Sequence, residues 1–397
     1  MKRKNLVLII IAAIAVLALI AVGFVYRKYY RGLAPAFLDA PYDIAANDTD
    51  LPLSVPDGFS ITVFAKDLNQ PRVILFDMKS NVLVSLPQEG KVVALPDKDG
   101  DRKADEQIVV AENLNQPHGL AIRCVNDCRL YVAETDKVSV FDYDSDTMTA
   151  TNQEKLIDLP GDGEHWTRTL KFLNKDKLLI SVGSSCDTCV EDDWRRASIL
   201  IVDADGSNLR PYASGLRNSV FMAISPLTGK LFATEMGRDN LGDELPPDEI
   251  NEIVQGKNYG WPYCYGDKVN DANFDETGAK KSFCASTQSP VVEIPAHSAP
   301  LGISFVPTAS WPKEYENDLL VAYHGSWNRT VPTGYKIVRV KFDAEGNYLE
   351  TEDFITGWLT GDEALGRPVD IAIHNLGAMF VSDDKAGVIY RIDYVGK

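Results

Sequence analysis

The feature that most constrains the fold is a pattern that recurs six times along the chain. Each copy is an apolar run, a short polar turn and a second apolar run, as in VLVSLPQEGKVVALPD. The copies begin at Val82, Leu130, Leu178, Leu231, Leu319 and Met379. Two such runs predict adjacent antiparallel strands. Six copies in series favour an all-β, six-bladed β-propeller over a pair of β-sandwiches, because a closed ring leaves only short, protected sheet edges.

A further strand precedes several copies, in the segments HGLAI, TRTLKF, SVFMAI, LGISF and VDIAI. We expect these strands to enter each blade from the centre of the ring. The repeat averages roughly 57 residues, longer than the 40–50 of common propeller repeats. The excess falls in loops such as 187–197 and 237–248. The predicted propeller extends over residues 56–397.

The N-terminus predicts a membrane anchor. Leu6 to Val25 contain no charged residue and follow a basic start, Met1-Lys2-Arg3-Lys4. Twenty residues of helix span ~30 Å, the thickness of a bilayer core. We therefore expect a cytoplasmic tip at 1–4, a transmembrane helix at 5–26 and a linker at 27–55. A cleaved signal peptide is the alternative, although its apolar region is usually only roughly 7–15 residues long.

The six cysteines fall into three close couples, which predict disulfides and an oxidising compartment. The couples are Cys124 with Cys128, Cys186 with Cys189, and Cys264 with Cys284. Basic residues flank the apolar span on both sides, so charge alone does not orient it. The cysteines place the propeller on the extracytoplasmic side. A zinc site at Cys186-Asp-Thr-Cys189 is the alternative, but no second ligand pair lies at a suitable distance.

Charge excludes one class of partner and suggests another. The net charge of −17 argues against nucleic-acid binding. Two acidic segments are rich in oxygen ligands for calcium, Asp97–Asp105 and Gly237–Asn251. The glycine of the first segment is misplaced for an EF-hand, so that segment is either a calcium site or a solvated turn.

Polar residues that precede the inner strands should share one pocket, because those strands converge on the central channel. They are Gln116, His118, Glu164, His165, Arg168, Arg217, Asn218, His297, Arg367 and Asp370, and His324 ends another strand. Arg217 and Arg367 suit a polyanionic ligand, since guanidinium binds carboxylates in bidentate fashion. Salt bridges between blades are the alternative. The histidines could bind metal, act as a base or be structural.

Several of these segments resemble the glucose/sorbosone dehydrogenase family, which uses pyrroloquinoline quinone. The similar segments are GEHWTRTLKF, SGLRNSVFMAI, DEIN followed by NYGWP, AHSAPLGISF, AYHGSWNR and GRPVD. The likeness covers roughly Val55 to Tyr394 and is greatest to the sorbosone-dehydrogenase-like branch. It implies a six-bladed propeller with pyrroloquinoline quinone and calcium as cofactors.

The resemblance also implies roles for individual residues. His165 matches the family's general base, Arg217 and Asn218 match a pair beside the quinone, and Arg367 matches an arginine that meets a cofactor carboxylate. Calcium would be held by backbone carbonyls in the loop that resembles Gly237-Arg238, with Asp248 in the same loop. The remaining expected cofactor contacts are Gln116, Arg168, His297, His324 and Arg329.

Two departures from the soluble glucose-oxidising members bear on the substrate. The segment AYHGSWNR offers His324, Asn328 or Arg329 where those members have a lysine, and Met236 stands in place of a glutamine. We therefore expect a dehydrogenase that oxidises an aldose or a sugar-derived aldehyde by hydride transfer to the quinone. Its electrons would pass to a membrane quinone or a cytochrome. The alternatives are a calcium-dependent propeller hydrolase, such as a lactonase, and a non-catalytic carbohydrate-binding module.

Overall fold

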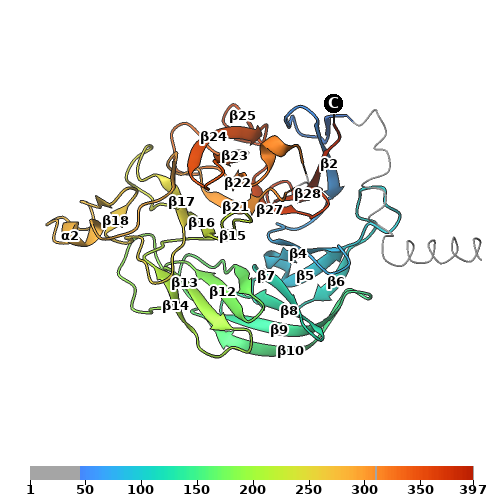
Figure 1. Ribbon diagram of the computed structural model, residues 1–397, viewed down its shortest axis with the longest axis horizontal. Helices are drawn as coiled ribbons and strands as arrows, with labels where there is room; N and C mark the ends of the chain where they lie inside the picture. Colours follow the sequence, from blue (N-terminus) through green and yellow to red (C-terminus); the bar gives the residue numbers. More distant parts are fainter. Residues whose placement is uncertain (1–44, 309–310, 397) are drawn as a thin grey trace, which may run out of the picture.

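The computed structural model describes residues 45–308 and 311–396, which form six sheets arranged around a central channel (Figure 1). Five blades, each listed from the inner to the outer strand, are β3–β6 (Ile74–Phe76, Val82–Leu86, Lys91–Leu95, Ile108–Ala111), β7–β10 (Leu120–Cys124, Cys128–Ala133, Lys137–Asp144, Thr149–Asp158), β11–β14 (Leu170–Asn174, Lys177–Val182, Ser198–Asp203, Arg210–Ser214), β15–β16–β17–β20 (Met222–Ile224, Leu231–Glu235, Asp248–Glu252, Val292–Ile294) and β21–β24 (Pro300–Phe305, Leu319–Tyr323, Lys336–Phe342, Tyr348–Ile355). The sixth is β27–β28–β29–β2 (Pro368–Ile373, Met379–Asp383, Val388–Tyr394, Phe59–Ala65), with β1 (Asn47–Asp48) at its edge. The all-β, six-bladed propeller predicted from the repeat is confirmed.

The sixth blade closes the ring by joining the two ends of the propeller domain. Strand β2 pairs antiparallel with β29, with Phe59 opposite Tyr394. In Figure 1 the blue β2 accordingly lies next to the red strands of the C-terminus. The inner strands contact one another in sequence, from β3 round to β27 and back to β3. Closure of this kind protects the sheet edges that an open array would expose.

The core lies between the blades. The second strand of a blade is buried on both faces, as in β4 (VLVSL) and β28 (MFVSD), because neighbouring blades cover both sides. Val84 of β4 and Phe380 of β28, for example, belong to one buried cluster. This explains why the second strands read as continuous apolar runs and gave the repeat its strong signal.

The six predicted hairpins coincide with the second and third strands of the six blades, β4–β5 through β28–β29. The structure adds elements that the sequence did not predict. The innermost strand of the first blade, β3, has only three residues, and the outer strands β6, β10, β14, β20 and β24 complete the sheets. Strand β10 shows why they escaped notice: its sequence TATNQEKLID is largely exposed and carries no apolar run.

Smaller elements decorate the ring. They are β18 (Cys264–Tyr265), β19 (Val269–Asn270), α2 (Lys281–Cys284), β25 (Leu359–Thr360), β26 (Glu363–Ala364) and the 3-10 turns η2 (Pro87–Glu89) and η3 (Lys313–Tyr315). Part of the stretch predicted as a linker lies against the propeller: β1 pairs with β2, and Leu53 is buried.

All three predicted disulfides are present. Cys124–Cys128 joins directly opposite residues of β7 and β8, Cys264–Cys284 links β18 to α2, and Cys186–Cys189 closes a turn in the loop after β12. The predicted tip (1–4) and transmembrane helix (5–26) lie outside the described residues. Within 45–308 and 311–396, no helix is long and apolar enough to cross a membrane.

Candidate functional site

The candidate site lies at the end of the channel where the inner strands begin. Residues that precede those strands reach this end, and so do the residues that follow the second strand of each blade, because the two strands are antiparallel. We call this end the mouth. The opposite end opens into a cavity of ≈ 580 Å³ lined by the inner strands, including Phe76, Phe172 and Phe305.

His165 is held as a neutral base. Its Nδ1 lies 2.9 Å from both the carbonyl oxygen and the hydroxyl oxygen of Ser184. The Ser184 hydroxyl donates its own hydrogen to the carbonyl of Cys186 (2.6 Å), so it acts toward His165 as an acceptor. The imidazole proton therefore sits on Nδ1, and Nε2 keeps an unshared pair. Burial, followed by the charge of Arg217, lowers the pKa of His165 to about 4.

Arg217 is fixed by the turn that the Cys186–Cys189 disulfide closes. Its Nη2 donates to Asp187 Oδ1 (2.8 Å) and its Nε donates to the Asp187 carbonyl (2.9 Å). Asp187 Oδ1 also accepts a hydrogen bond from the backbone N–H of Asp239 (2.8 Å). One carboxylate thus joins the arginine to the loop that follows β16.

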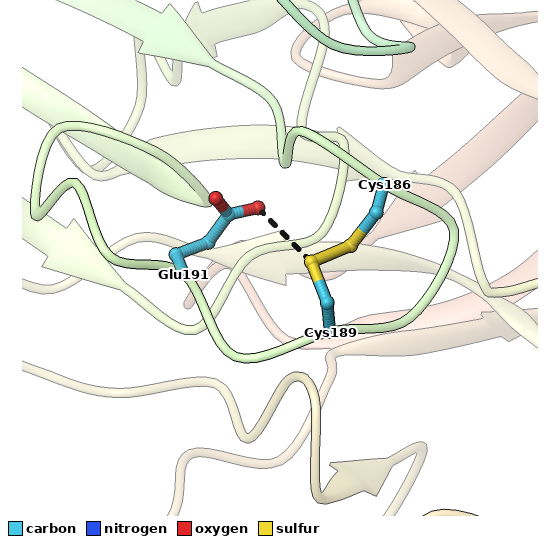
Figure 2. Close-up of side chains that lie close together, drawn as sticks. All are labelled: Cys186, Cys189 and Glu191. Carbon is cyan, nitrogen blue, oxygen red and sulfur yellow. Dashed lines mark hydrogen bonds between the residues drawn. A yellow bond between two sulfur atoms is a disulfide. The ribbon is translucent and has the colours of Figure 1, made fainter.

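Figure 2 shows this turn, with the two sulfur atoms bonded to each other and Glu191 beside them. The carboxylate of Glu191 approaches the Cys189 sulfur at 3.9 Å. That sulfur carries no hydrogen, so the approach is a contact and not a donated bond. Glu191 instead accepts from the backbone N–H (2.6 Å) and hydroxyl (2.9 Å) of Ser185. The group is a covalent clamp, because sulfurs bonded to each other are not the thiolates that zinc requires.

Gly183 allows His165 and Asn218 to lie close together. A Cβ at this position would come 2.7 Å from Asn218 Oδ1 and 2.7 Å from His165 Cβ, which is closer than side chains tolerate. The backbone N–H of Asn218 donates to Glu235 Oε1 (2.9 Å). His165, Arg217 and Asn218 therefore form one cluster on the β11 and β15 side of the mouth, as expected from the sequence.

A second cluster lies on the side of β27 and β3. His324 Nε2 is 2.9 Å from Asp384 Oδ1, and Arg72 Nη1 donates to Asp384 Oδ2 (2.7 Å). Burial raises the pKa of Asp384, but the hydrogen bond from His324 and the charges of His324 and Arg72 outweigh burial and bring that pKa to about 2. Arg367 Nη2 donates to the Gly325 carbonyl (2.7 Å). The Nε atoms of Arg72 and Arg367 are buried without an acceptor in the described part of the chain.

The loop after β16 is anchored from below by Asp248. The two carboxylate oxygens of Asp248 accept from the backbone N–H groups of Gly237 (2.8 Å) and Ala299 (2.9 Å). Burial raises the pKa of this carboxyl to about 7. Asp248 therefore sets the position of Gly237 and Arg238, while the Arg238 guanidinium itself pairs with Asp271 (2.9 Å).

His297 and Arg329 hold the same loop from the side. His297 Nε2 lies 2.8 Å from the Gly242 carbonyl, and Arg329 donates to the Ala296 carbonyl (3.2 Å) and pairs with Glu244. Asn328 adds a hydrogen bond to Asp239 (2.6 Å). These side chains, expected at the cofactor, are seen here making contacts that shape the rim of the mouth.

Three further predicted residues also make structural contacts. Arg168 is fully buried and donates to the carbonyls of His165 (2.8 Å), Thr167 (2.7 Å) and Pro160 (2.7 Å), so it supports the loop that carries the base. His118 is fully buried, with Nδ1 3.1 Å from the Arg168 carbonyl. Gln116 is exposed and accepts from the Thr135 hydroxyl (3.3 Å).

The Asp97–Asp105 segment forms the loop between β5 and β6, at the end of its blade opposite the mouth. The carboxylates of Asp97, Asp99 and Asp105 converge there. Asp97 also accepts from the backbone N–H groups of Gly100 (2.7 Å) and Arg102 (3.0 Å), as the side chain of a tight polar turn does. This segment takes no part in the mouth.

Sequence reasoning missed four residues of the mouth: Arg72, Ser184, Asp187 and Asp384. Arg72 precedes β3, so recognition of that short inner strand would have revealed it. Ser184 and Asp384 follow second strands, which return to the same end of the blade. Asp187 had no sequence signal beyond its place between two bonded cysteines.

The fold and site together define a class: a six-bladed propeller whose mouth holds a neutral histidine among guanidinium groups. A family model described as TrAA12-like matches residues 53–395, and the chain belongs to that family. This confirms the family resemblance inferred from the sequence.

Individual relatives agree with that assignment. An uncharacterized protein of Borreliella burgdorferi is 30% identical over 385 residues, covering 93% of this chain and 98% of that protein. A pyrroloquinoline quinone-dependent pyranose dehydrogenase of Coprinopsis cinerea is 26% identical over 406 residues, covering 86% of this chain but only 54% of that enzyme. The solved holo form of the Coprinopsis cinerea pyranose dehydrogenase PQQ domain has the same fold, with a TM-score of 0.75, 23% identity, and coverage of 87% of this chain and 98% of that domain.

Proposed function

We propose that the protein is a quinone-dependent dehydrogenase that oxidises an aldose or a sugar-derived aldehyde. The observation that carries the proposal is the base at the mouth: His165 is neutral, its Nδ1 proton is bound to Ser184, and Arg217 and Asn218 lie beside it. The named Coprinopsis relative supports the same chemistry.

The residues present fit pyrroloquinoline quinone, a cofactor with three carboxylates. Three guanidinium groups, those of Arg72, Arg217 and Arg367, lie at one mouth, and the Nε atoms of Arg72 and Arg367 are buried without an acceptor among the described residues. Arginine matches carboxylates in geometry and charge. When bound, the quinone would supply the carbonyl carbon that accepts hydride from the substrate.

The chain's own residues supply the proton transfer. His165 Nε2 takes the proton from a substrate hydroxyl or from a hydrated aldehyde. The Nδ1 hydrogen bonds to the two Ser184 oxygens keep the ring oriented and stabilise the positive charge that it gains. Arg217, fixed by Asp187, places a positive charge where negative charge develops.

Calcium belongs to the same proposal. The residues that would hold it are the backbone carbonyls of Gly237 and Arg238, in the loop that Asp248, His297 and Arg329 anchor. Carbonyl oxygens are ligands that calcium accepts. Removal of calcium by a chelator should lower activity, and added calcium should restore it.

The decisive experiment reconstitutes the purified propeller with pyrroloquinoline quinone and calcium. Quinone binding is followed by absorbance, and turnover by dye reduction with a panel of aldoses and sugar aldehydes. His165→Gln should keep quinone binding and lose roughly 10²–10⁴-fold in kcat, the usual contribution of a general base. His374→Gln is the matched control, because His374 follows β27 at the opposite end of the channel, where it bonds Ser80 (2.9 Å). Failure to bind the quinone, or lactone hydrolysis without it, would overturn the proposal.

We further propose that residues 5–26 anchor the propeller in a membrane, on the extracytoplasmic side. The three disulfides support an oxidising compartment. The electron acceptor would then be a membrane quinone or a cytochrome. Deletion of residues 1–44 should release active propeller from the membrane fraction; release of the full chain by a salt wash would contradict an anchor.

A further inference from the structure

Trp327 presents a large aromatic surface to solvent. Its side chain is 74% exposed, although tryptophan is highly buried on average in folded proteins. It lies in the loop after β22, in the segment HGSWNR. An aromatic group displayed in this way is either incidental or meets a ligand, and the residues on either side of it distinguish the two.

The backbone on both sides of Trp327 is fixed. Ser326 exchanges two hydrogen bonds with Thr333, from its N–H to the Thr333 carbonyl (2.9 Å) and from the Thr333 N–H to its hydroxyl (3.0 Å). On the other side, the Asn328 amide donates to Asp239 (2.6 Å). Trp327 is therefore held at a defined place, which lowers the entropy that a ligand would have to overcome.

The same contacts locate Trp327 at the mouth. The carbonyl of Ser326 accepts from Arg367 Nη2 (3.2 Å). Asp239, the partner of Asn328, lies 3.8 Å from Arg217. Trp327 thus stands between residues that touch two of the arginines of the candidate site. It is on the rim, since its side chain is exposed while Arg217 is buried.

The surroundings combine apolar and hydrogen-bonding groups. Val331 on the same loop is 68% exposed, and Leu245 on the loop after β16 is 47% exposed. The two loops are joined by the Arg329–Glu244 ion pair and by the hydrogen bond from the Thr330 N–H to Asp243 (3.1 Å). A pyranose ring has a C–H face that packs on an aromatic ring and an edge of hydroxyl groups that charged side chains can bind.

Resting on the proposed function, we propose that Trp327 is the stacking platform for a second sugar ring. The preferred substrate is then an oligosaccharide whose reducing end reaches His165 while the next ring packs on the indole. A lone monosaccharide that reacts at His165 would not extend to the rim.

The test compares a reducing disaccharide with its monosaccharide in the quinone-loaded enzyme. Trp327→Ala should lower kcat/KM for the disaccharide roughly 10-fold, mainly through KM, because an aromatic stacking contact is worth about 1 kcal/mol and 1.4 kcal/mol is tenfold. The monosaccharide value should change less than about 2-fold. Trp327→Phe should retain most of the disaccharide preference. Met78→Ala is the matched control, since Met78 is 69% exposed at the far end of the channel.

A second readout separates this proposal from the proposed function. Binding of the disaccharide alditol, which has no aldehyde to oxidise, is measured by tryptophan fluorescence without quinone; Trp327→Ala should abolish it. Equal losses for both sugars, or loss of quinone binding in the variant, would overturn the platform and place Trp327 at the cofactor or at a protein partner. Quinone titration and monosaccharide turnover report on the dehydrogenase independently.

Discussion

Gly183→Ala tests the geometry of the site with a single methyl group. The residue follows β12, and its φ lies outside the left-handed region, so alanine introduces no backbone strain. The new Cβ would lie 2.7 Å from Asn218 Oδ1 and from His165 Cβ, whereas ordinary contact begins at 3.4 Å. One or both side chains must therefore retreat by about 0.7 Å.

A displacement of this size should be costly for catalysis and modest for stability. Misplacement of reacting groups by about 1 Å costs up to 10²-fold in rate, so we expect kcat to fall roughly 10- to 100-fold. Overpacking destabilises by about 1–3 kcal/mol, so the propeller should still fold. The assay is dye reduction under saturating quinone, with thermal unfolding measured on the same sample.

Gly161→Ala is the control for the steric effect itself. Its Cβ would also meet an atom at 2.7 Å, Cβ of Asp136, but Gly161 is exposed and its clash lies outside the cluster of His165, Arg217 and Asn218. This variant should keep its kcat. Unchanged turnover in Gly183→Ala, with quinone bound as in the wild type, would refute the assignment of His165 and Asn218 to the reacting centre.

Two further predictions concern titration and the disulfide turn. Because the pKa of His165 is about 4 in the fold and 6.5 ordinarily, the unfolded chain binds more protons between these values; the free energy of unfolding contributed by His165 should be complete above pH 6.5 and fall as the pH drops toward 4. His165→Gln should flatten that part of a stability-against-pH curve measured without cofactor, and an unaltered curve would contradict the burial argument. Replacing Cys186 and Cys189 together by serine should lower kcat about 10-fold, since the turn positions both Ser184 and Asp187. The same change at Cys124 and Cys128, which clasp an outlying hairpin, should leave kcat intact, and equal effects of the two pairs in dye reduction would show that the turn has no special role.

The sequence by itself determined the architecture and the neighbourhood of the site. The second and third strands of each blade are buried between neighbours, so their apolar runs are visible in the sequence and give the blade count. Once the inner strands are known, topology alone brings His165, Arg217 and Arg367 to one mouth. The cysteine spacing was also sufficient, because each couple is close in the chain.

Only the tertiary structure decided what each polar side chain does there. Arg168 and Arg217 both precede inner strands, yet the guanidinium of Arg168 is used by three backbone carbonyls while Arg217 is held beside the base. Asp248 was expected at a metal and bonds two backbone amides instead. Arg72 and Asp384, which pair across the closure of the ring, are 312 residues apart. Strand periodicity is a local property of the chain, whereas hydrogen-bond partners at a propeller mouth come from different blades, and no local pattern records which of them meet.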